Sequence, residues 1–238
     1  MRSLRTAVCL AVAAASLSLS GSVRAAVSSP SPGATVRGAV AISENEGGTK
    51  PFYCGSDGLD STITVRRVSD SAVVHQASKG SGGGWTTTWT THGLPIGAYR
   101  IVSVAASKNG TCSVVESTLS DFQVTLENFS SVTYTGETNA GIAFPFTASA
   151  RLVDQFTGLA IQGRSVTFSI GETPVGNCVT GADGRCSTRA SAVASPGSHT
   201  IKVSFAGDCC WRSSSSTATL TVTPLPPCIV DPVSCVPA

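Results

Sequence analysis

Cysteines are the residues of this sequence with the clearest potential for chemistry. The chain has 238 residues and nine cysteines, of which Cys9 lies in an N-terminal apolar stretch. The other eight form an even set, which in an exported protein favours disulfides over free thiols. These eight are Cys54, Cys112, Cys178, Cys186, Cys209, Cys210, Cys228 and Cys235. We therefore predict an oxidised protein that disulfides stabilise.

The first 25 residues have the features of a signal peptide. Arg2 and Arg5 supply the positive charge, and residues 7–19 form an apolar stretch too short to cross a bilayer. We predict cleavage after Ala25 and a secreted or extracellular location. No later apolar run approaches the roughly 20 residues of a spanning helix, so we expect no membrane span in the mature chain.

The remaining reactive residues do not form a recognisable catalytic or metal-binding pattern. The histidines are His75, His92 and His199, and none accompanies a G-x-S-x-G nucleophile elbow. The cysteine spacings do not match paired C-x2-C zinc motifs. We therefore predict a protein that is not an enzyme and that has no cofactor and no metal.

Composition and aromatic residues limit the choice of partner. The net charge of +2 is too small to indicate nucleic acid as a partner. Trp85 and Trp89 lie on one face of a predicted strand that follows a Gly-rich segment. We expect Trp89 to fill a core, whereas Trp85, if exposed, could stack on a sugar ring.

The elements that must position these residues are strands. Residues 34–42, 61–68 and 146–152 alternate apolar and polar side chains, as half-buried strands do. Residues 44–49 form a polar loop, and residues 181–184 (G-A-D-G) indicate the turn of a hairpin. No window after the signal has a helical apolar period. The sequence therefore predicts an all-β fold in which sheets bury each other's apolar faces.

Motifs in both halves support one particular sandwich. Residues 30–40 read P-x-x-G-x-x-V-x-G-x-V, residues 158–168 read G-x-x-I-x-G-R-S-V-T-F, and residues 196–201 read P-G-S-H-T-I. These motifs resemble bacterial immunoglobulin-like (Ig-like) repeats, which occur in tandem on secreted and cell-surface proteins. The resemblance implies two tandem Ig-like β-sandwich domains, residues 26–127 and 128–224, before a short Pro/Cys tail, residues 225–238.

The resemblance also implies a structural role for two rings. Tyr99 and His199 occupy the third position of a shared G-x-[Tyr/His]-x-Ile pattern. In Ig sandwiches a ring at this position forms a corner by bonding backbone upstream. We predict that both residues are structural corners.

The disulfide pairing is only partly determined. We expect Cys54 to bond Cys112, the only other cysteine of the first domain, and we expect Cys228 and Cys235 to close the tail. In the second domain, Cys178 and Cys186 could bond each other across the hairpin, which leaves the neighbours Cys209 and Cys210 as a vicinal pair. Alternatively, each could bond one of those neighbours. We expect this latter arrangement. We call it the two-staple arrangement, because two disulfides would join the hairpin to Cys209 and Cys210.

These observations predict a secreted, non-enzymatic Ig-like protein that acts as an extracellular structural, adhesion or interaction module. The alternative is a glycan-binding accessory protein that uses Trp85. The partner is an unknown protein or glycan at the cell exterior.

Overall fold

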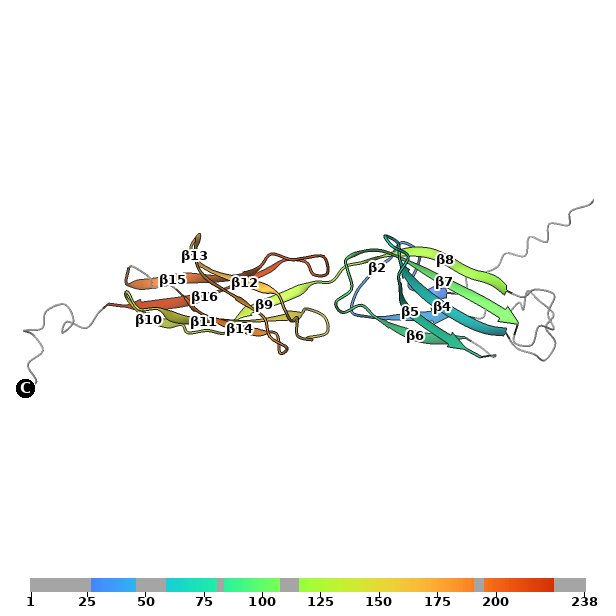
Figure 1. Cartoon of the computed structure of the whole chain (residues 1–238), viewed down its shortest axis with the longest axis horizontal. Helices are drawn as coiled ribbons and strands as arrows, with labels where there is room; N and C mark the ends of the chain where they lie inside the picture. Colours follow the sequence, from blue (N-terminus) through green and yellow to red (C-terminus); the bar gives the residue numbers. More distant parts are fainter. Residues whose placement is uncertain (1–26, 46–58, 81–83, 108–115, 191–194, 225–238) are drawn as a thin grey trace, which may run out of the picture.

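A computed structural model describes residues 27–45, 59–80, 84–107, 116–190 and 195–224. Within these ranges the chain contains sixteen strands and no helix. The strands form two β-sandwiches that lie end to end (Figure 1). No helix in the described part of the chain is long and apolar enough to cross a membrane.

Strands β1–β8 form the first sandwich from one sheet of three strands and one of five. The three-stranded sheet has the order β1 (Val27–Ser29), β3 (Ala39–Glu44) and β6 (Trp85–Thr90). The five-stranded sheet has the order β2 (Thr35–Val36), β8 (Glu116–Leu126), β7 (Gly97–Ser107), β4 (Leu59–Arg67) and β5 (Val73–Lys79).

Strands β9–β16 repeat this arrangement. The three-stranded sheet has the order β9 (Ser130–Tyr134), β11 (Phe146–Asp154) and β14 (Arg185–Ala190). The five-stranded sheet has the order β10 (Asn139–Gly141), β16 (Ser214–Thr223), β15 (Gly197–Phe205), β12 (Ser165–Ile170) and β13 (Thr173–Val179).

Both sandwiches have the strand order of an immunoglobulin domain. In each, the first, third and sixth strands pair in one sheet, and the remaining strands form the other. The second strand of each sandwich pairs parallel with the last, β2 with β8 and β10 with β16, whereas the other pairs of strands are antiparallel. The predicted fold class, all-β with two tandem Ig-like sandwiches, is confirmed. The disulfide-closed tail that we predicted at residues 225–238 lies outside the described residues.

Alternation of side chains explains why these segments pair as they do. In β11, the buried residues Phe146, Ala148, Ala150 and Leu152 alternate with polar or charged residues on the other face. Such a strand must cover one face with an opposing sheet. The alternation therefore accounts for both the strands and the core between them.

The two cores are built around different aromatic side chains. In the first sandwich, the rings of Trp89 and Tyr99 are fully buried, and their centroids lie 5.2 Å apart. In the second, Phe168 is fully buried and its ring meets that of Tyr134 edge to face. Trp89 thus fills the core, as the sequence predicts.

Two local predictions are wrong. Glu44, predicted in a loop, is the last residue of β3, and its side chain is buried. Residues 181–184 do form a turn, in which Gly184 has φ +74° and a Cβ would lie 2.4 Å from the Leu152 carbonyl oxygen. However, this turn does not close a hairpin, because β13 and β14 belong to opposite sheets.

Candidate functional site

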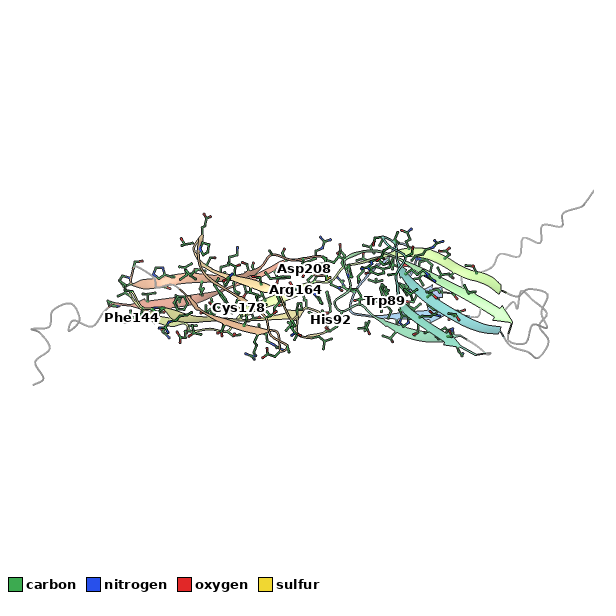
Figure 2. All side chains as sticks on the ribbon, in the orientation of Figure 1. Trp89, His92, Phe144, Arg164, Cys178 and Asp208 are labelled. Atoms are coloured by element: carbon green, nitrogen blue, oxygen red, sulfur yellow. A yellow bond between two sulfur atoms is a disulfide. The ribbon has the colours of Figure 1, made fainter. Side chains whose placement is uncertain are left out.

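Cys178 and Cys186 form a disulfide across the two sheets of the second sandwich. Cys178 lies on β13 and Cys186 on β14, with a sequence separation of 8. The two-staple arrangement that we predicted is therefore wrong. Because the turn at 181–184 passes from one sheet to the other, its flanking strands face each other across the edge of the core, where a direct bond is possible. Figure 2 places Cys178 in the body of the second sandwich.

Cys209 and Cys210 are the other two cysteines that the structure describes. Both are free, and their Sγ atoms lie 2.6 Å apart. Cys209 is exposed and Cys210 is buried. The other candidate cysteines, Cys54, Cys112, Cys228 and Cys235, lie outside the described residues.

Trp85 is half-buried at the start of β6. Its indole N–H donates a hydrogen bond of 2.8 Å to Oε2 of Glu44, and the Ser61 hydroxyl donates to the same oxygen. Glu44 is only 1% exposed, and Trp85 packs against the core. The polar edge of the Trp85 ring therefore faces the interior, where a ligand in solvent would not meet it.

Tyr99 and His199 make equivalent contacts in the two sandwiches. The Tyr99 hydroxyl donates a hydrogen bond of 2.7 Å to the carbonyl oxygen of Pro95, four residues upstream. Nε2 of His199 lies 3.0 Å from the carbonyl oxygen of Ser195, also four residues upstream. Each ring therefore links the start of a long strand to the connection that precedes it.

A polar network lies where the two sandwiches meet. Only three residues, 127–129, separate the end of β8 at Leu126 from the start of β9 at Ser130. Three loops surround this joint: residues 91–96 of the first sandwich, and residues 155–164 and 206–213 of the second. Figure 2 places His92, Arg164 and Asp208 near this junction.

Asn128 fixes the joint to the first sandwich. Its side chain is 2% exposed, and its Nδ2 donates to the carbonyl oxygens of Thr91 and Leu94 at 3.2 Å and 3.1 Å. Its own carbonyl accepts the backbone N–H of Arg212 at 2.9 Å. Asn128 thus connects the loop of one sandwich with the loop of the other.

Charged and aromatic groups close the sides of the joint. Arg212 forms an ion pair of 2.8 Å with Glu127. The guanidinium of Arg37 lies 4.5 Å from the ring centroid of Phe156 and 5.8 Å from that of Phe129. Each of these contacts joins side chains from different parts of the joint.

A histidine and a carboxylate face each other across the joint. Nδ1 of His92 lies 3.3 Å from Oδ2 of Asp154, and the His92 ring meets the ring of Trp211 at 5.0 Å. Burial would raise the pKa of the Asp154 carboxyl, but the backbone N–H groups of Phe156 and Thr157, together with His92, outweigh it and lower that pKa.

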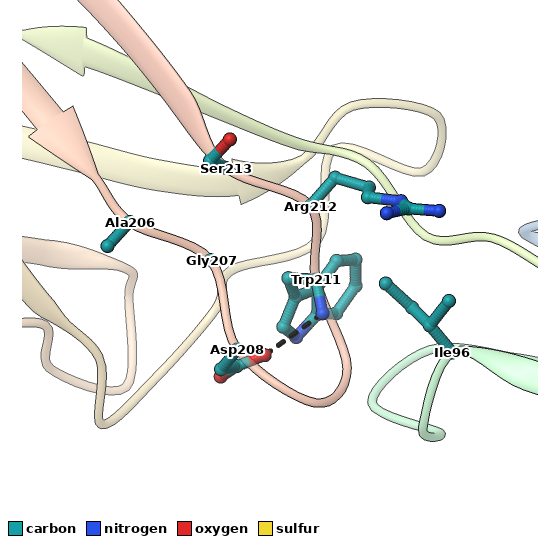
Figure 3. Close-up of a pocket in the computed structure, with 7 residues that line it drawn as sticks. All are labelled: Ile96, Ala206, Gly207, Asp208, Trp211, Arg212 and Ser213. Atoms are coloured by element: carbon teal, nitrogen blue, oxygen red, sulfur yellow. Dashed lines mark hydrogen bonds between the residues drawn. The ribbon is translucent and has the colours of Figure 1, made fainter.

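The loop at 206–213 also contacts the first sandwich directly. The backbone N–H of Ile96 donates a hydrogen bond of 2.8 Å to the carbonyl oxygen of Cys209. Beside this contact is an open pocket of about 440 Å³. Figure 3 shows Ile96 facing this loop, and the pocket is lined by Ile96, Ala206, Gly207, Asp208, Trp211, Arg212 and Ser213.

Asp208 organises the turn that carries the two cysteines. Its Oδ1 accepts the backbone N–H of Trp211 at 2.9 Å (Figure 3) and that of Cys210 at 2.8 Å. Its other oxygen forms an ion pair with Arg164. The ligand atoms of Asp208, Cys209 and Cys210 all lie within 4.8 Å of one another. However, two sulfurs on one tetrahedral zinc ion, each at about 2.3 Å, would be about 3.8 Å apart. The observed 2.6 Å therefore does not fit such an ion.

Sequence reasoning missed the joint almost completely. Asn128 begins an Asn-Phe-Ser sequon, and nothing in that motif indicates a buried side chain. His92 and Asp154 are 62 positions apart, so only the relative placement of the sandwiches brings them together. The contact between Ile96 and Cys209 is made by backbone atoms and leaves no signal in residue type.

Comparisons with known proteins do not assign this chain to a family. No protein-family model matches the chain, and no curated protein matches it by sequence. Among solved structures, a putative membrane anchored protein from Corynebacterium diphtheriae is similar over 82% of this chain and 53% of its own, with 13% identity and a TM-score of 0.33. This chain thus spans about half the length of that protein.

Two other solved structures are similar at the same level. The titin domains Z1Z2, in a complex with telethonin, match 83% of this chain and 96% of their own, with 15% identity and a TM-score of 0.33. The ICAM-5 D1–D4 ectodomain fragment matches 84% and 53%, with 13% identity and a TM-score of 0.34. Scores this low carry no argument about function, and the Ig-like assignment rests on the strand order.

Proposed function

We propose that this protein is a secreted, non-enzymatic Ig-like module that acts as a stiff extracellular spacer, with its two domains at residues 26–127 and 128–224. The observation that carries this proposal is the joint. A flexible tether would need linker residues free of contacts. Here Glu127, Asn128 and Phe129 each contact side chains or backbone of a neighbouring loop. A joint of this kind holds two domains in line.

The placement of Trp85 favours this function over glycan binding. A sugar-stacking ring must present its face to solvent, whereas Trp85 is half-buried against the core and uses its N–H on Glu44. The Cys178–Cys186 disulfide supports an oxidising, extracellular location. We extend the proposal to cleavage after Ala25, which would release the mature chain.

Small-angle X-ray scattering tests the spacer. The mature chain, residues 26–238, is compared with the double variant Asn128→Ala/Arg212→Ala, which removes the Asn128 side-chain hydrogen bonds and the Arg212–Glu127 ion pair. We expect one elongated particle for the wild type and a broader distribution of distances, with a shorter mean, for the variant. The matched control is Asn177→Ala/Arg185→Ala, because Asn177 and Arg185 are exposed and lie on β13 and β14.

Two results would refute the spacer. One is a wild-type chain that already scatters as a flexible pair of domains, and the other is a joint variant that scatters like its control. A glycan array with wild type and Trp85→Ala tests the alternative separately. We expect no binding by either, and binding that Trp85→Ala abolishes would establish the glycan-binding function instead.

A further inference from the structure

The turn that holds Cys209 and Cys210 brings their two sulfurs to the same side. In an extended strand, neighbouring side chains point to opposite faces. Here Asp208 accepts the N–H groups of Cys210 and Trp211, and its own N–H donates to the Trp211 carbonyl at 3.0 Å. Gly207 precedes the turn with φ +84°, and a Cβ there would lie 2.9 Å from the Ser213 nitrogen. The turn is therefore fixed from both ends.

From this geometry we propose that Cys209 and Cys210 are a thiol–disulfide exchange site, which interconverts between a dithiol and a vicinal disulfide by reaction with small-molecule disulfides. The sulfurs lie 2.6 Å apart, so the ring closes with little motion of the side chains. The proposal does not rest on the spacer function, although the loop lies at the joint, and Cys209 and Cys210 are the only pair of free cysteines among the described residues.

Exposure gives the two sulfurs different roles. Cys209 is exposed, whereas Cys210 is 6% exposed. Burial, together with the neighbouring Cys209 and Asp208, raises the pKa of the Cys210 thiol to about 12. Because the thiolate is the attacking form, Cys209 is the residue that meets an external disulfide first, and Cys210 is the resolving residue.

The exchange is a balanced two-electron reaction. The Cys209 thiolate attacks one sulfur of a small-molecule disulfide, forms a mixed disulfide and releases one small thiolate. Cys210 then loses its proton to solvent, and its sulfur attacks Sγ of Cys209. This step closes the vicinal bond and releases the second small thiolate. The protein pair is oxidised by two electrons, and the external disulfide is reduced to two thiols.

The site is distinct from the structural disulfide in the same domain. Cys178 and Cys186 are already bonded to each other between two sheets. Cys209 and Cys210 lie in a loop, with one sulfur open to solvent. Exposed disulfides are the ones that exchange readily, whereas structural disulfides resist reduction. We therefore expect only the loop pair to respond to a mild redox buffer.

Redox titration followed by mass spectrometry tests the proposal. The mature chain is equilibrated in glutathione buffers of graded ratio, quenched in acid, alkylated and digested with trypsin. Cleavage after Lys202 and Arg212 gives a peptide, residues 203–212, whose only cysteines are this pair. We expect two alkyl groups on this peptide in reducing buffers and none in oxidising buffers, where it is two hydrogens lighter than the dithiol. The Cys178–Cys186 bond is the internal control and stays intact.

Single variants test the assigned roles. Cys210→Ser leaves the exposed sulfur without a resolving partner, so we expect it to accumulate a glutathione adduct on Cys209. Cys209→Ser leaves only the buried sulfur, and we expect at least a tenfold lower yield of adduct. The reverse pattern would overturn the roles. The exchange site itself is refuted if the wild-type peptide stays doubly alkylated at every ratio, or if it is linked to another cysteine-containing peptide. This titration needs only the unmodified chain, so a variant that fails to fold does not affect it.

Discussion

The two sandwiches have the same strand order, but their described residues fill the space between the sheets differently. The first has a buried Trp89–Tyr99 pair at its centre. The second has the sheet-to-sheet Cys178–Cys186 bond beside a core that contains Phe168. An Ig-like topology thus fixes which strands pair, while it leaves open how the space between the sheets is filled.

Paired positions on the three-stranded sheets show this freedom directly. In the first sandwich, Trp89 of β6 lies opposite Val40 of β3. In the second, the larger residue is on the other strand, where Phe146 of β11 lies opposite Ala190 of β14. The sheet pairing therefore does not dictate which strand carries the larger core residue.

The largest effect is expected from truncating a central aromatic residue of the second sandwich. Phe168→Ala removes a fully buried ring and should destabilise that sandwich by about 3–5 kcal/mol. Calorimetry should show its unfolding transition at lower temperature and the transition of the first sandwich almost unchanged. Phe144→Ala is the control, because Phe144 is 53% exposed. Equal losses in both transitions would mean that the sandwiches unfold as one unit.

The inter-sheet disulfide should have the next largest effect. The double variant Cys178→Ser/Cys186→Ser opens a loop of eight positions, which on the chain-entropy relation costs about 2.5 kcal/mol. The control variant is Cys209→Ser, which changes an exposed cysteine outside the bond. Urea denaturation of the double variant, this control and the wild type measures the loss of stability. A double variant as stable as this control would show that the bond adds nothing to the second sandwich.

A smaller effect tests the proposal that Tyr99 and His199 are structural corners. Tyr99→Phe keeps the buried ring but removes the hydrogen bond to Pro95, at a cost of about 1 kcal/mol. His199→Ala should lower the melting temperature less, because His199 is only half-buried. Tyr134→Phe is the control, since its hydroxyl bonds the Glu137 carbonyl at an exposed site. An unchanged melting temperature for Tyr99→Phe contradicts the corner assignment.

The smallest effect concerns pH at the joint. Asp154 has a lowered pKa when folded. Its carboxylate therefore stabilises the folded chain fully above its ordinary value of 3.8, and this stabilisation is lost as the pH falls through the lower folded-state value. Asp154→Asn should lose less stability than the wild type between pH 7 and pH 3. Asp70 and Asp121, bonded by Arg67 and Arg100, also have lowered pKa values, so both chains lose stability in acid and only the difference between them reports on Asp154.

Melting curves across this pH range measure the effect. The exposed Asp183, changed to Asn, is the control and should follow the wild type. If Asp154→Asn loses as much stability in acid as the wild type does, the carboxylate contributes nothing to acid sensitivity.

The sequence predicted the sheets well because the alternation along a strand depends only on local side-chain order. In β12 and β15, for example, Val166, Phe168, Ile201 and Val203 are buried, as their spacing indicates. Disulfide pairing was not predictable, because it depends on the sheet that each strand joins, and β13 and β14 are neighbours in sequence but not in a sheet. The joint was not predictable either, since backbone groups such as the Cys209 carbonyl carry much of it.

The parallel strand pairs have a consequence for mechanical load. The chain enters the second sandwich at the joint and leaves it at the opposite end (Figure 1). Tension between the termini therefore pulls β10 toward the joint and β16 away from it. Because these strands run parallel in the register Asn139–Thr221, Ala140–Val222 and Gly141–Thr223, the pull slides one along the other. The hydrogen bonds between them then share the force at the same moment, whereas a hairpin pulled at its open end loses its bonds one at a time.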